Sequence, residues 1–213
     1  MCIRDRYIEN TLGLKTTCTP TGVKHLHPAA EAFDVGVYFE ANGHGTALFS
    51  DDALLKIAAC ANDPNGSDVS RRAAASLPAL AETINPEVGD ALSGVLVLES
   101  VLRAKKWGLA DWDATYLDLP SKQVKVRVRD RSVIVTADAE RRAVAPEGMQ
   151  AAIDAIVASF GKDADARAFA RPSGTEDVVR VYAEGRTRDI ADALALAVAR
   201  IVHAHAGGVG DQP

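Results

Sequence analysis

A short polar loop, residues 171–177 (RPSGTED), combines residue types that suit the binding of an anion. Gly174 lets the backbone turn and approach a ligand closely. The hydroxyls of Ser173 and Thr175 can donate hydrogen bonds, and the backbone N–H groups of such a loop can converge on an anion. The loop lacks the Gly-Lys-Ser/Thr ending of a P-loop, so nucleotide chemistry is not indicated.

Two arginines accompany this loop. Arg171 carries a planar guanidinium that fits phosphate oxygens, and Arg180 follows in the next β-prone run, from which it can reach back. Together they favour the binding of a phosphate monoester. Residue types alone leave an alternative open, a plain hairpin loop in which Pro172 and Gly174 serve only the turn.

A second loop presents polar groups of another kind. In residues 38–50 (YFEANGHGTALFS), Glu40, Asn42 and His44 alternate with small residues after a β-prone run. A carboxylate accepts two O–H hydrogen bonds and an amide both donates and accepts, so Glu40 and Asn42 suit adjacent sugar hydroxyls. His44 could titrate or donate near a reacting centre. The alternative is a glycine-rich turn with a solvated glutamate and a structural histidine.

A third stretch, residues 19–30 (TPTGVKHLHPAA), places Lys24, His25 and His27 on an expected short strand or turn. Lys24 could meet a phosphate or sugar oxygen as a point charge. The two histidines have no carboxylate or cysteine companion nearby, so no metal site is predicted there.

The three stretches occur in the order in which the α-D-phosphohexomutases carry similar motifs. RPSGTEDVVRVYAE resembles the phosphate-binding loop of the last domain of that family, and FEANGHG resembles the sugar-binding loop of its third domain. TGVKHLH, together with Asn42 where serine is more usual, resembles one subfamily, the phosphoacetylglucosamine mutases of eukaryotic type.

The resemblance implies a role for particular residues of this sequence. It implies that the substrate sugar is bound by Glu40, Ala41 and Asn42, with Lys24 and His44 as further contacts and His44 as a possible proton-transfer group. It implies that the phosphate remote from the reaction is bound by Arg171, Pro172, Ser173, Gly174, Thr175 and Arg180.

The resemblance also implies an activity. The family interconverts N-acetylglucosamine 6-phosphate and 1-phosphate, on the route to UDP-N-acetylglucosamine. It uses a phosphoserine in the first domain and a magnesium ion held by a D-G-D-x-D-R loop in the second. These 213 residues contain neither that motif nor a recognisable phosphoserine loop. We therefore expect the carboxy-terminal half of such a mutase, without metal ligands and inactive alone. Its partners would be a phosphosugar and the missing N-terminal domains.

A stand-alone, non-catalytic phosphosugar-binding module is the alternative. A nucleic-acid binder that uses the basic run 122–131 was also considered. Alternating charges opposite valines are usual for a solvated strand face, and only 5% of the residues are aromatic. The net charge of −5 further disfavours bulk binding to nucleic acid or anionic membranes.

Composition allows an ordinary core, because 47% of the residues are hydrophobic and 25% are charged. No apolar run approaches the ~18 residues needed to span a bilayer, and the first residues lack the apolar core of a signal peptide. Three scattered cysteines are typical of a reduced, cytoplasmic protein with buried thiols.

The predicted fold class is α/β followed by α+β. Residues 1–6 match nothing in the family and are expected to be a non-native leader. Residues 7–112 would form the sugar-binding domain, which the resemblance implies to be a three-layer mixed sheet covered by helices. Residues 113–213 would form the phosphate-binding domain, an antiparallel sheet packed by two helices, which the periodicity supports.

The periodicity predicts strands at 33–41, 122–130 and 132–140, the last two pairing with each other. The runs 167–170 and 178–185 are predicted to flank the phosphate loop as strands. Helices are predicted at 50–62, 69–84 with a break or kink at Pro78, 85–108, 146–161 and 187–208. The third of these would begin at Asn85 and Pro86 and be buried through Leu92, Val95, Leu96, Leu98 and Leu102.

Overall fold

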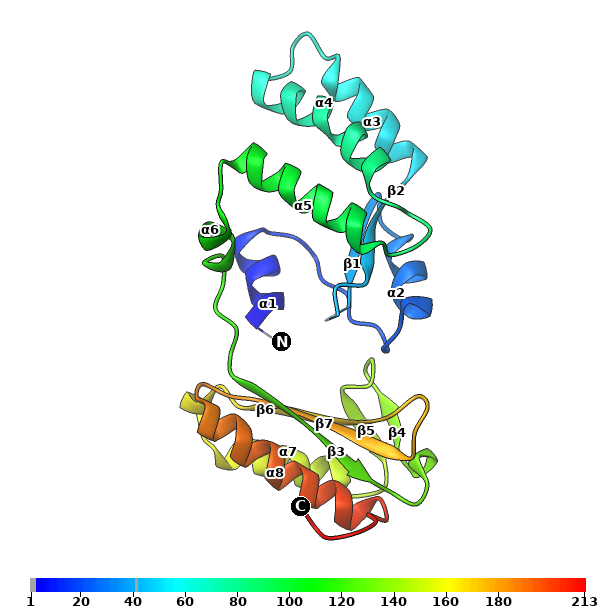
Figure 1. The fold of residues 1–213 in the computed structure, drawn as a ribbon, viewed down its shortest axis with the longest axis vertical. Coiled ribbons are helices and arrows are strands. Elements are labelled where there is room, and N and C mark those ends of the chain that lie inside the picture. The colour runs from blue at the N-terminus through cyan, green and yellow to red at the C-terminus, as the bar shows by residue number, and fades with distance from the viewer. Residues whose placement is uncertain (1–2, 41) are drawn as a thin grey trace. The chain divides into compact units, whose positions relative to one another are not determined.

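The computed structural model describes residues 3–40 and 42–213 and divides the chain into two compact units. One unit is Thr19–Thr115. The other joins Tyr116–Pro213 with the N-terminal segment that ends at Cys18. Both units mix helices with antiparallel strands, which confirms the predicted fold class (Figure 1). The assignment of 7–112 and 113–213 to a sugar-binding and a phosphate-binding domain stays a prediction.

The unit Thr19–Thr115 is built on one β-hairpin and a series of helices. Strands β1 (Val35–Phe39) and β2 (Gly45–Phe49) pair antiparallel, with Phe39 opposite Gly45 at the turn. The helices are α2 (Val23–Ala30), α3 (Asp51–Ala61), α4 (Asp68–Thr83), α5 (Ala91–Lys105) and the short α6 (Leu109–Asp113). The expectation of a mixed sheet in this part differs from the structure. A mixed sheet needs a strand returned by a crossover connection, whereas the described chain after β2 forms only helices up to β3 in the other unit.

Side-chain caps decide where these helices begin. The Ser50 hydroxyl accepts a hydrogen bond from the N–H of Ala53 and starts α3, as predicted. The prediction that α5 starts at Asn85 is wrong, because the Asp90 carboxylate accepts from the N–H groups of Leu92 and Ser93. The side chain of Asn85 instead accepts hydrogen bonds from the N–H groups of Glu87 and Val88, in the turn that leads into α5.

Two further expectations for these helices differ from the structure. The predicted break at Pro78 is absent, because α4 continues through it: the proline removes only one backbone hydrogen bond and α4 also packs on α3. The alternative of a kink there stays a prediction. Leu92, Val95 and Leu96 of α5 are exposed, and only Leu102 of the five leucines and valines named above is fully buried. The small two-stranded sheet of this unit offers little surface for the rest of that helix to cover.

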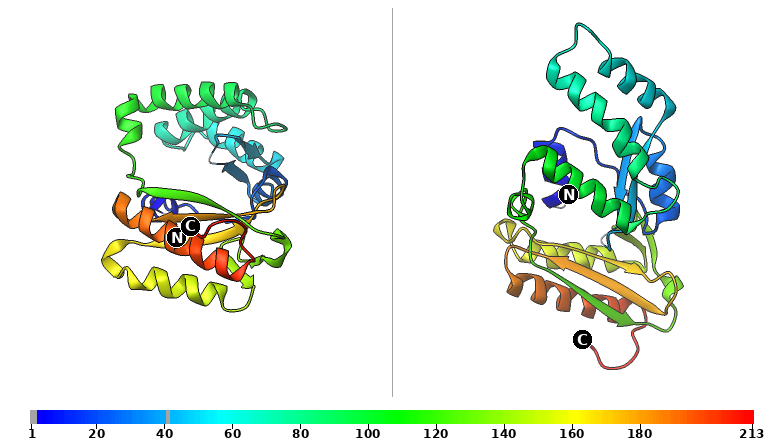
Figure 2. Two further views of the ribbon diagram at one scale, coloured as in Figure 1. Left: turned by 60° about the horizontal axis from the view of Figure 1, so that its bottom comes forward. Right: turned by 45° about the horizontal axis from the view of Figure 1, so that its top comes forward.

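The second unit centres on a three-stranded antiparallel sheet in the order β3-β7-β6. The strands are β3 (Ser121–Arg127), β6 (Arg167–Pro172) and β7 (Val178–Glu184). Helices α7 (Met149–Ser159) and α8 (Arg188–His205) both cover one face of it (Figure 1; Figure 2, left). The N-terminal segment of this unit forms α1 (Ile3–Arg6) and a π-helical turn, Tyr7–Thr11, in which Tyr7 contacts the ring of Tyr116.

Strands β4 (Val135–Ala137) and β5 (Arg142–Ala145) form a separate two-stranded sheet. The prediction that residues 132–140 pair with β3 is therefore wrong. A 3-10 turn, Arg131–Val133, redirects the chain after β3. A tight turn at residues 138–140 then folds β4 onto β5 instead.

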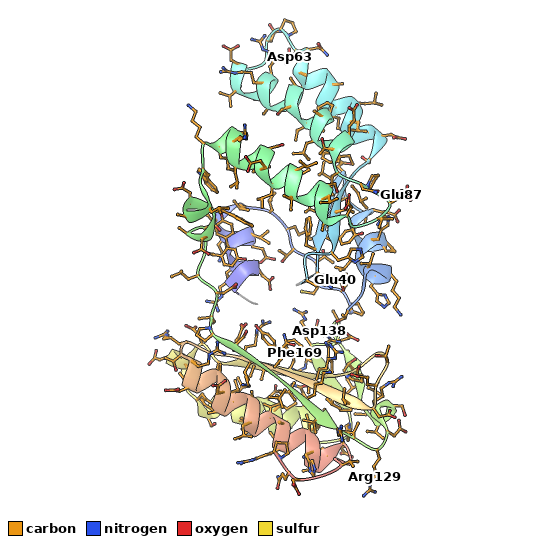
Figure 3. The ribbon with its side chains drawn as sticks, viewed as in Figure 1. Glu40, Asp63, Glu87, Arg129, Asp138 and Phe169 are labelled. Atoms are coloured by element: carbon orange, nitrogen blue, oxygen red, sulfur yellow. The ribbon has the colours of Figure 1, made fainter. Side chains whose placement is uncertain are left out.

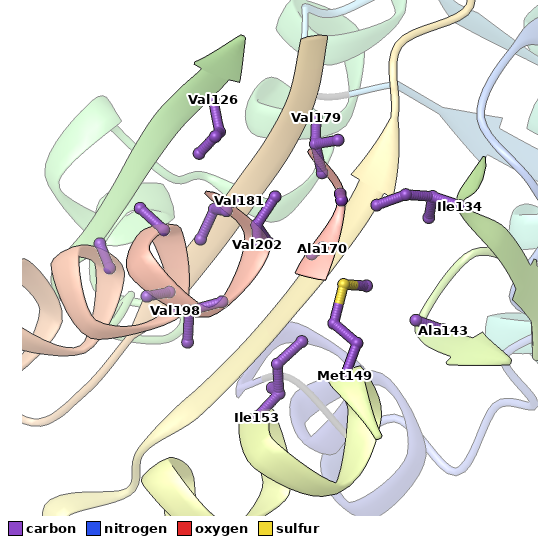
Figure 4. Close-up of a cluster of buried hydrophobic side chains, with 14 of the residues drawn as sticks. Val126, Ile134, Ala143, Met149, Ile153, Ala170, Val179, Val181, Val198 and Val202 are labelled. Carbon is purple, nitrogen blue, oxygen red and sulfur yellow. The ribbon is translucent and has the colours of Figure 1, made fainter. Parts of the chain in front are cut away.

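The core of this unit fills the space between the sheet and its two helices (Figure 4). Val126 of β3 is buried, as are Val179 and Val181 of β7, while Lys125 and Arg127 are exposed. This confirms the predicted alternation along β3. Opposite them lie Met149 and Ile153 of α7 and Val198 and Val202 of α8, each fully buried. Leu194 of α8 belongs to the same core and is also fully buried.

The core predicts a large difference between two leucines of α8. Leu194 is fully buried, whereas Leu196 is 41% exposed on the same helix. Replacing Leu194 by alanine leaves a cavity and should lower the free energy of unfolding by about 2–5 kcal/mol. The matched change Leu196→Ala should cost roughly 1 kcal/mol or less. Urea denaturation of both variants measures this, and equal costs would contradict the described packing of α8.

Candidate functional site

The β1–β2 turn brings Glu40, Asn42 and His44 together at the end of the hairpin, and Glu40 is labelled there in Figure 3. The N–H of Glu40 donates to the carbonyl of His44 at 2.8 Å, and the N–H of His44 donates to Asn42 Oδ1 at 2.8 Å. His44 Nδ1 lies 3.4 Å from Glu40 Oε2. Gly43 has φ of +86°, a left-handed conformation that glycine adopts without strain. Ala41, the remaining predicted sugar contact, lies outside the described residues.

The connection between α4 and α5 supports this turn from one side. The fully buried Thr46 donates its hydroxyl hydrogen to the carbonyl of Asn85 at 2.6 Å. A Cβ on Gly89 would lie 2.4 Å from Cδ2 of His44 and 2.7 Å from the N of Gly45, so only glycine allows this approach. Sequence reasoning missed Gly89, because the helix predicted at 85–108 included it.

Lys24 and His27 occupy a different element. The expectation of a strand or turn there is wrong, because Val23–Ala30 forms α2. The left-handed Gly22 immediately precedes that helix. His27 Nδ1 lies 3.1 Å from the hydroxyl of Tyr38, and its Nε2 lies 3.6 Å from Glu31, so it links α2 to β1. Lys24 is exposed in the first turn of α2, an element other than the β1–β2 turn that holds the other predicted sugar contacts.

A cavity of about 230 Å³ lies on the same unit. Glu31 and Glu87 contribute its carboxylates, and Phe33, Leu48 and Pro86 contribute apolar surface. Glu40, Asn42 and His44 are not among its lining residues. The hairpin turn therefore presents its polar groups on a surface outside that cavity.

The β6–β7 hairpin carries the predicted phosphate loop, and it contains two buried polar atoms without a partner. Ser173 is 4% exposed, and its N–H donates to the carbonyl of Val178 at 2.9 Å. Its Oγ and the Nε of Arg180 are buried and have no hydrogen-bond partner among the described residues. Leaving such a group unsatisfied costs about 1–3 kcal/mol. An anion that accepted both hydrogen bonds would offset that cost.

Gly174 and Thr175 form the exposed tip of this loop. The φ of Gly174 is not left-handed, so its conformation alone does not require glycine. A Cβ there would meet no other described atom within 4 Å, which leaves room for close approach of a ligand. Arg131 steadies the tip, because its Nη2 donates to the carbonyl of Gly174 at 3.3 Å and its Nη1 lies 3.7 Å from Asp177.

Arg131 is a residue that sequence reasoning missed. The run RDRS reads only as a turn in the sequence, and the contact with Gly174 joins residues that are 43 positions apart. Nothing local in the sequence signals such a contact. Arg171, by contrast, lies where predicted, at the end of β6, and its Nη1 is 3.9 Å from Glu140 Oε2.

A second cluster lies on the face of the sheet away from α7 and α8, where Phe169 is labelled in Figure 3. Phe169 stacks on Tyr182 with 5.1 Å between ring centroids. The buried Glu184 accepts hydrogen bonds from Arg167 Nε at 2.8 Å and from the Tyr182 hydroxyl at 2.6 Å. Burial, followed by the hydrogen bond to Glu184 and the charge of that residue, raises the pKa of Tyr182 to about 12.

Two family models match the chain in succession. Residues 4–107 match "Phosphoacetylglucosamine mutase AMG1, domain III", and residues 124–201 match "Phosphoglucomutase/phosphomannomutase, C-terminal domain". The chain is 50% identical over 208 residues to the phosphoacetylglucosamine mutase of Mus musculus, and 52% identical over 191 residues to phosphoacetylglucosamine mutase 1 of Schizosaccharomyces pombe. These matches cover 98% and 90% of this chain.

The chain belongs to the phosphoacetylglucosamine mutase family. It matches the C-terminal part of these relatives and spans 38% of the length of the mouse protein and 36% of that of the yeast protein. The fold agrees with the structure of Aspergillus fumigatus N-acetylphosphoglucosamine mutase in complex with GlcNAc-6P and magnesium. That comparison has a TM-score of 0.88 at 49% identity and covers 94% of this chain and 36% of that one. The resemblance noted from the three motifs is thus confirmed.

The structure of that relative contains magnesium, which raises the question of whether this chain also has a metal site. Across residues 3–40 and 42–213, no group of three or more His, Cys, Asp or Glu side chains is placed to hold a metal ion. The described residues therefore do not fit a metal centre.

No helix of the described chain is long and apolar enough to cross a membrane. Cys18 and Cys60 are free and exposed, so the expectation of buried thiols is wrong for these two.

The cluster around Tyr182 predicts a loss of stability at alkaline pH. A phenol whose pKa is near 12 when folded and about 10 when unfolded holds its proton better in the folded state. Its contribution to stability is therefore complete below pH ~10 and is lost as the pH rises towards 12. We expect Tyr182→Phe to show a smaller fall in the free energy of unfolding between pH 9 and 11.5 than the unmodified chain. Denaturation at several pH values tests this, and identical slopes would contradict it.

Proposed function

We propose that this chain supplies the sugar-binding and distal phosphate-binding surfaces of a phosphoacetylglucosamine mutase. Such an enzyme interconverts N-acetylglucosamine 6-phosphate and N-acetylglucosamine 1-phosphate for UDP-N-acetylglucosamine synthesis. The single observation that carries the proposal is the pair of buried, unpartnered atoms, Ser173 Oγ and Arg180 Nε, in the phosphate loop. The family membership supports the choice of substrate.

The phosphate loop is proposed to bind and orient, without taking part in bond making or breaking. Its Arg171 and Arg180 guanidiniums would carry the charge of the phosphate that does not react. Ser173, Thr175 and the loop N–H groups would fix its position. Holding one phosphate still places the opposite end of the sugar at a reacting centre, which lowers the entropic cost of the transfer step.

The hairpin turn is proposed to bind the ring hydroxyls. The Glu40 carboxylate would accept hydrogen bonds from two hydroxyls. Asn42 Oδ1 already accepts from the N–H of His44, so its NH₂ group is the part that would donate to the sugar. His44 lies close to Glu40, and the backbone of Gly89 packs against its ring. Of the side chains in this turn, His44 is the one that we propose could exchange a proton with the substrate.

The phosphoryl donor and the magnesium ligands would come from outside these 213 residues, since the sequence has no D-G-D-x-D-R motif and no recognisable phosphoserine loop. When bound, magnesium stabilises negative charge on the transferring phosphoryl group, and we assign no step of this chain to it. We place the protein in the cytoplasm, because its scattered cysteines are those of a reduced compartment. A non-catalytic phosphosugar-binding module is the second candidate, because the same loops would bind without chemistry.

Binding of N-acetylglucosamine 6-phosphate tests the phosphate site. Arg180→Gln removes a charged donor and should weaken binding by about tenfold or more. Ser173→Ala should weaken binding severalfold without lowering the melting temperature, since its hydroxyl makes no described hydrogen bond within the protein. The control is Ser159→Ala on α7, whose hydroxyl bonds only within its own helix. NMR chemical-shift titration measures all three, and unchanged affinity in Arg180→Gln would refute the site.

The two candidate functions separate on turnover. We expect the purified chain to convert no N-acetylglucosamine 6-phosphate to the 1-phosphate, with or without magnesium and a glucose 1,6-bisphosphate primer. A coupled assay for the 1-phosphate measures this, and detectable turnover would overturn the assignment of the phosphoryl donor to other residues. Restored turnover on adding the N-terminal portion of a family member would favour the mutase over the stand-alone module.

A further inference from the structure

Three cationic side chains lie side by side across the sheet that carries the phosphate loop. In the ladder register, Arg180 of β7 faces Arg171 of β6 on one side and Lys125 of β3 on the other. Directly opposed residues have Cβ atoms about 5 Å apart, and like charges in such positions repel. The neighbours of Arg180 along β7, Val179 and Val181, are buried in the core, so this row faces away from the helices.

Each outer cation of the row has a glutamate beside it. Arg171 Nη1 lies 3.9 Å from Glu140 Oε2, and Lys125 Nζ lies 3.5 Å from Glu176 Oε2. The central Arg180 instead has a buried Nε without a hydrogen-bond partner among the described residues. Three positive and two negative charges leave the row with one excess positive charge, centred on Arg180.

Glu140 is held beside Arg171 by an unusual stretch of backbone. Asp138, Ala139 and Glu140 have φ values of +53°, +54° and +63°, so three consecutive residues other than glycine are left-handed. Each such residue costs roughly 1–2 kcal/mol. Conformations of this kind persist where the surrounding structure requires them, often at functional sites. The strained turn here places the carboxylate of Glu140 beside Arg171.

We propose that Lys125 is a further ligand of the phosphate, and that the phosphate displaces Glu140 and Glu176 from the two outer cations. This rests on the proposed function and adds to it a cation that none of the three sequence motifs contains. A dianionic phosphate above Arg180 would meet a cation on each side. The displaced glutamates compete with it, which limits its affinity and allows it to leave the site.

The first test compares two lysines of the same strand. Lys125→Gln should weaken the binding of inorganic phosphate about three- to fivefold, as expected for a partly exposed ion pair. Lys122→Gln removes the same charge from β3, but Lys122 lies 4.0 Å from Asp192 of α8, on the helix side of the sheet. That control should leave the phosphate affinity unchanged. Two-dimensional NMR titration of the full chain to tens of millimolar phosphate measures both dissociation constants.

The second test removes a competing carboxylate. Glu140→Gln keeps the shape of the side chain and should tighten phosphate binding about three- to fivefold. Asp192→Asn removes one negative charge from a pair on the other face of the sheet and should have no effect. Thermal melts of all the variants verify that each is folded.

The outcomes separate this inference from the proposed function. If Arg180→Gln abolishes phosphate binding while Lys125→Gln and Glu140→Gln match the unmodified chain, the phosphate site stands and the wider row is wrong. Weaker binding in Glu140→Gln would show that Glu140 orients Arg171, which contradicts competition. If the unmodified chain shows no phosphate-dependent shifts at the β6–β7 hairpin, both proposals fall.

Discussion

The alternation of side chains along β7 is the constraint on which the unit with the proposed phosphate site depends. Val179, Val181 and Ala183 are fully buried and pack against the helices that cover the sheet. Because successive residues of a strand face opposite sides, Arg180 and Tyr182 must then lie on the face away from α7 and α8. Burial of small apolar side chains on one side therefore determines where the cations and the aromatic cluster stand on the other.

The rest of that face follows from pairing with β7. β6 and β3 add Arg171 and Lys125 beside Arg180 in one row, and Phe169 beside Tyr182 in the next. The repulsion within the first row is reduced by glutamates from two turns. In the second row, the Tyr182 hydroxyl donates to Glu184, which also accepts from Arg167. The first row retains a buried atom without a partner among the described residues, Arg180 Nε, which is why we assign the ligand to it.

The β1–β2 turn, the proposed sugar-binding site, is positioned by a different kind of support. It lies at the end of a two-stranded hairpin, which by itself is only marginally stable in water. The buried hydrogen bond from Thr46 to Asn85 and the approach of Gly89 to His44 join that turn to the connection between α4 and α5. Contacts of this kind place His44 against Glu40 more firmly than the hairpin alone could.

The sequence by itself determined many of the local elements and pointed to the chemistry that both loops are proposed to have. Alternating valines identified β3, apolar spacing identified α8, and Arg171, Ser173 and Arg180 could be selected because their types and spacing match an anion-binding hairpin. Local pattern could not reveal which strands pair, so β4 was assigned to β3 although a tight turn returns it to β5. Nor could it reveal the exposure of Leu92, because burial depends on what the rest of the chain places against a helix. Only the tertiary structure places Lys125, Arg131, Glu140 and Gly89 beside residues of the two candidate sites, since each meets its partner across more than 30 positions of sequence.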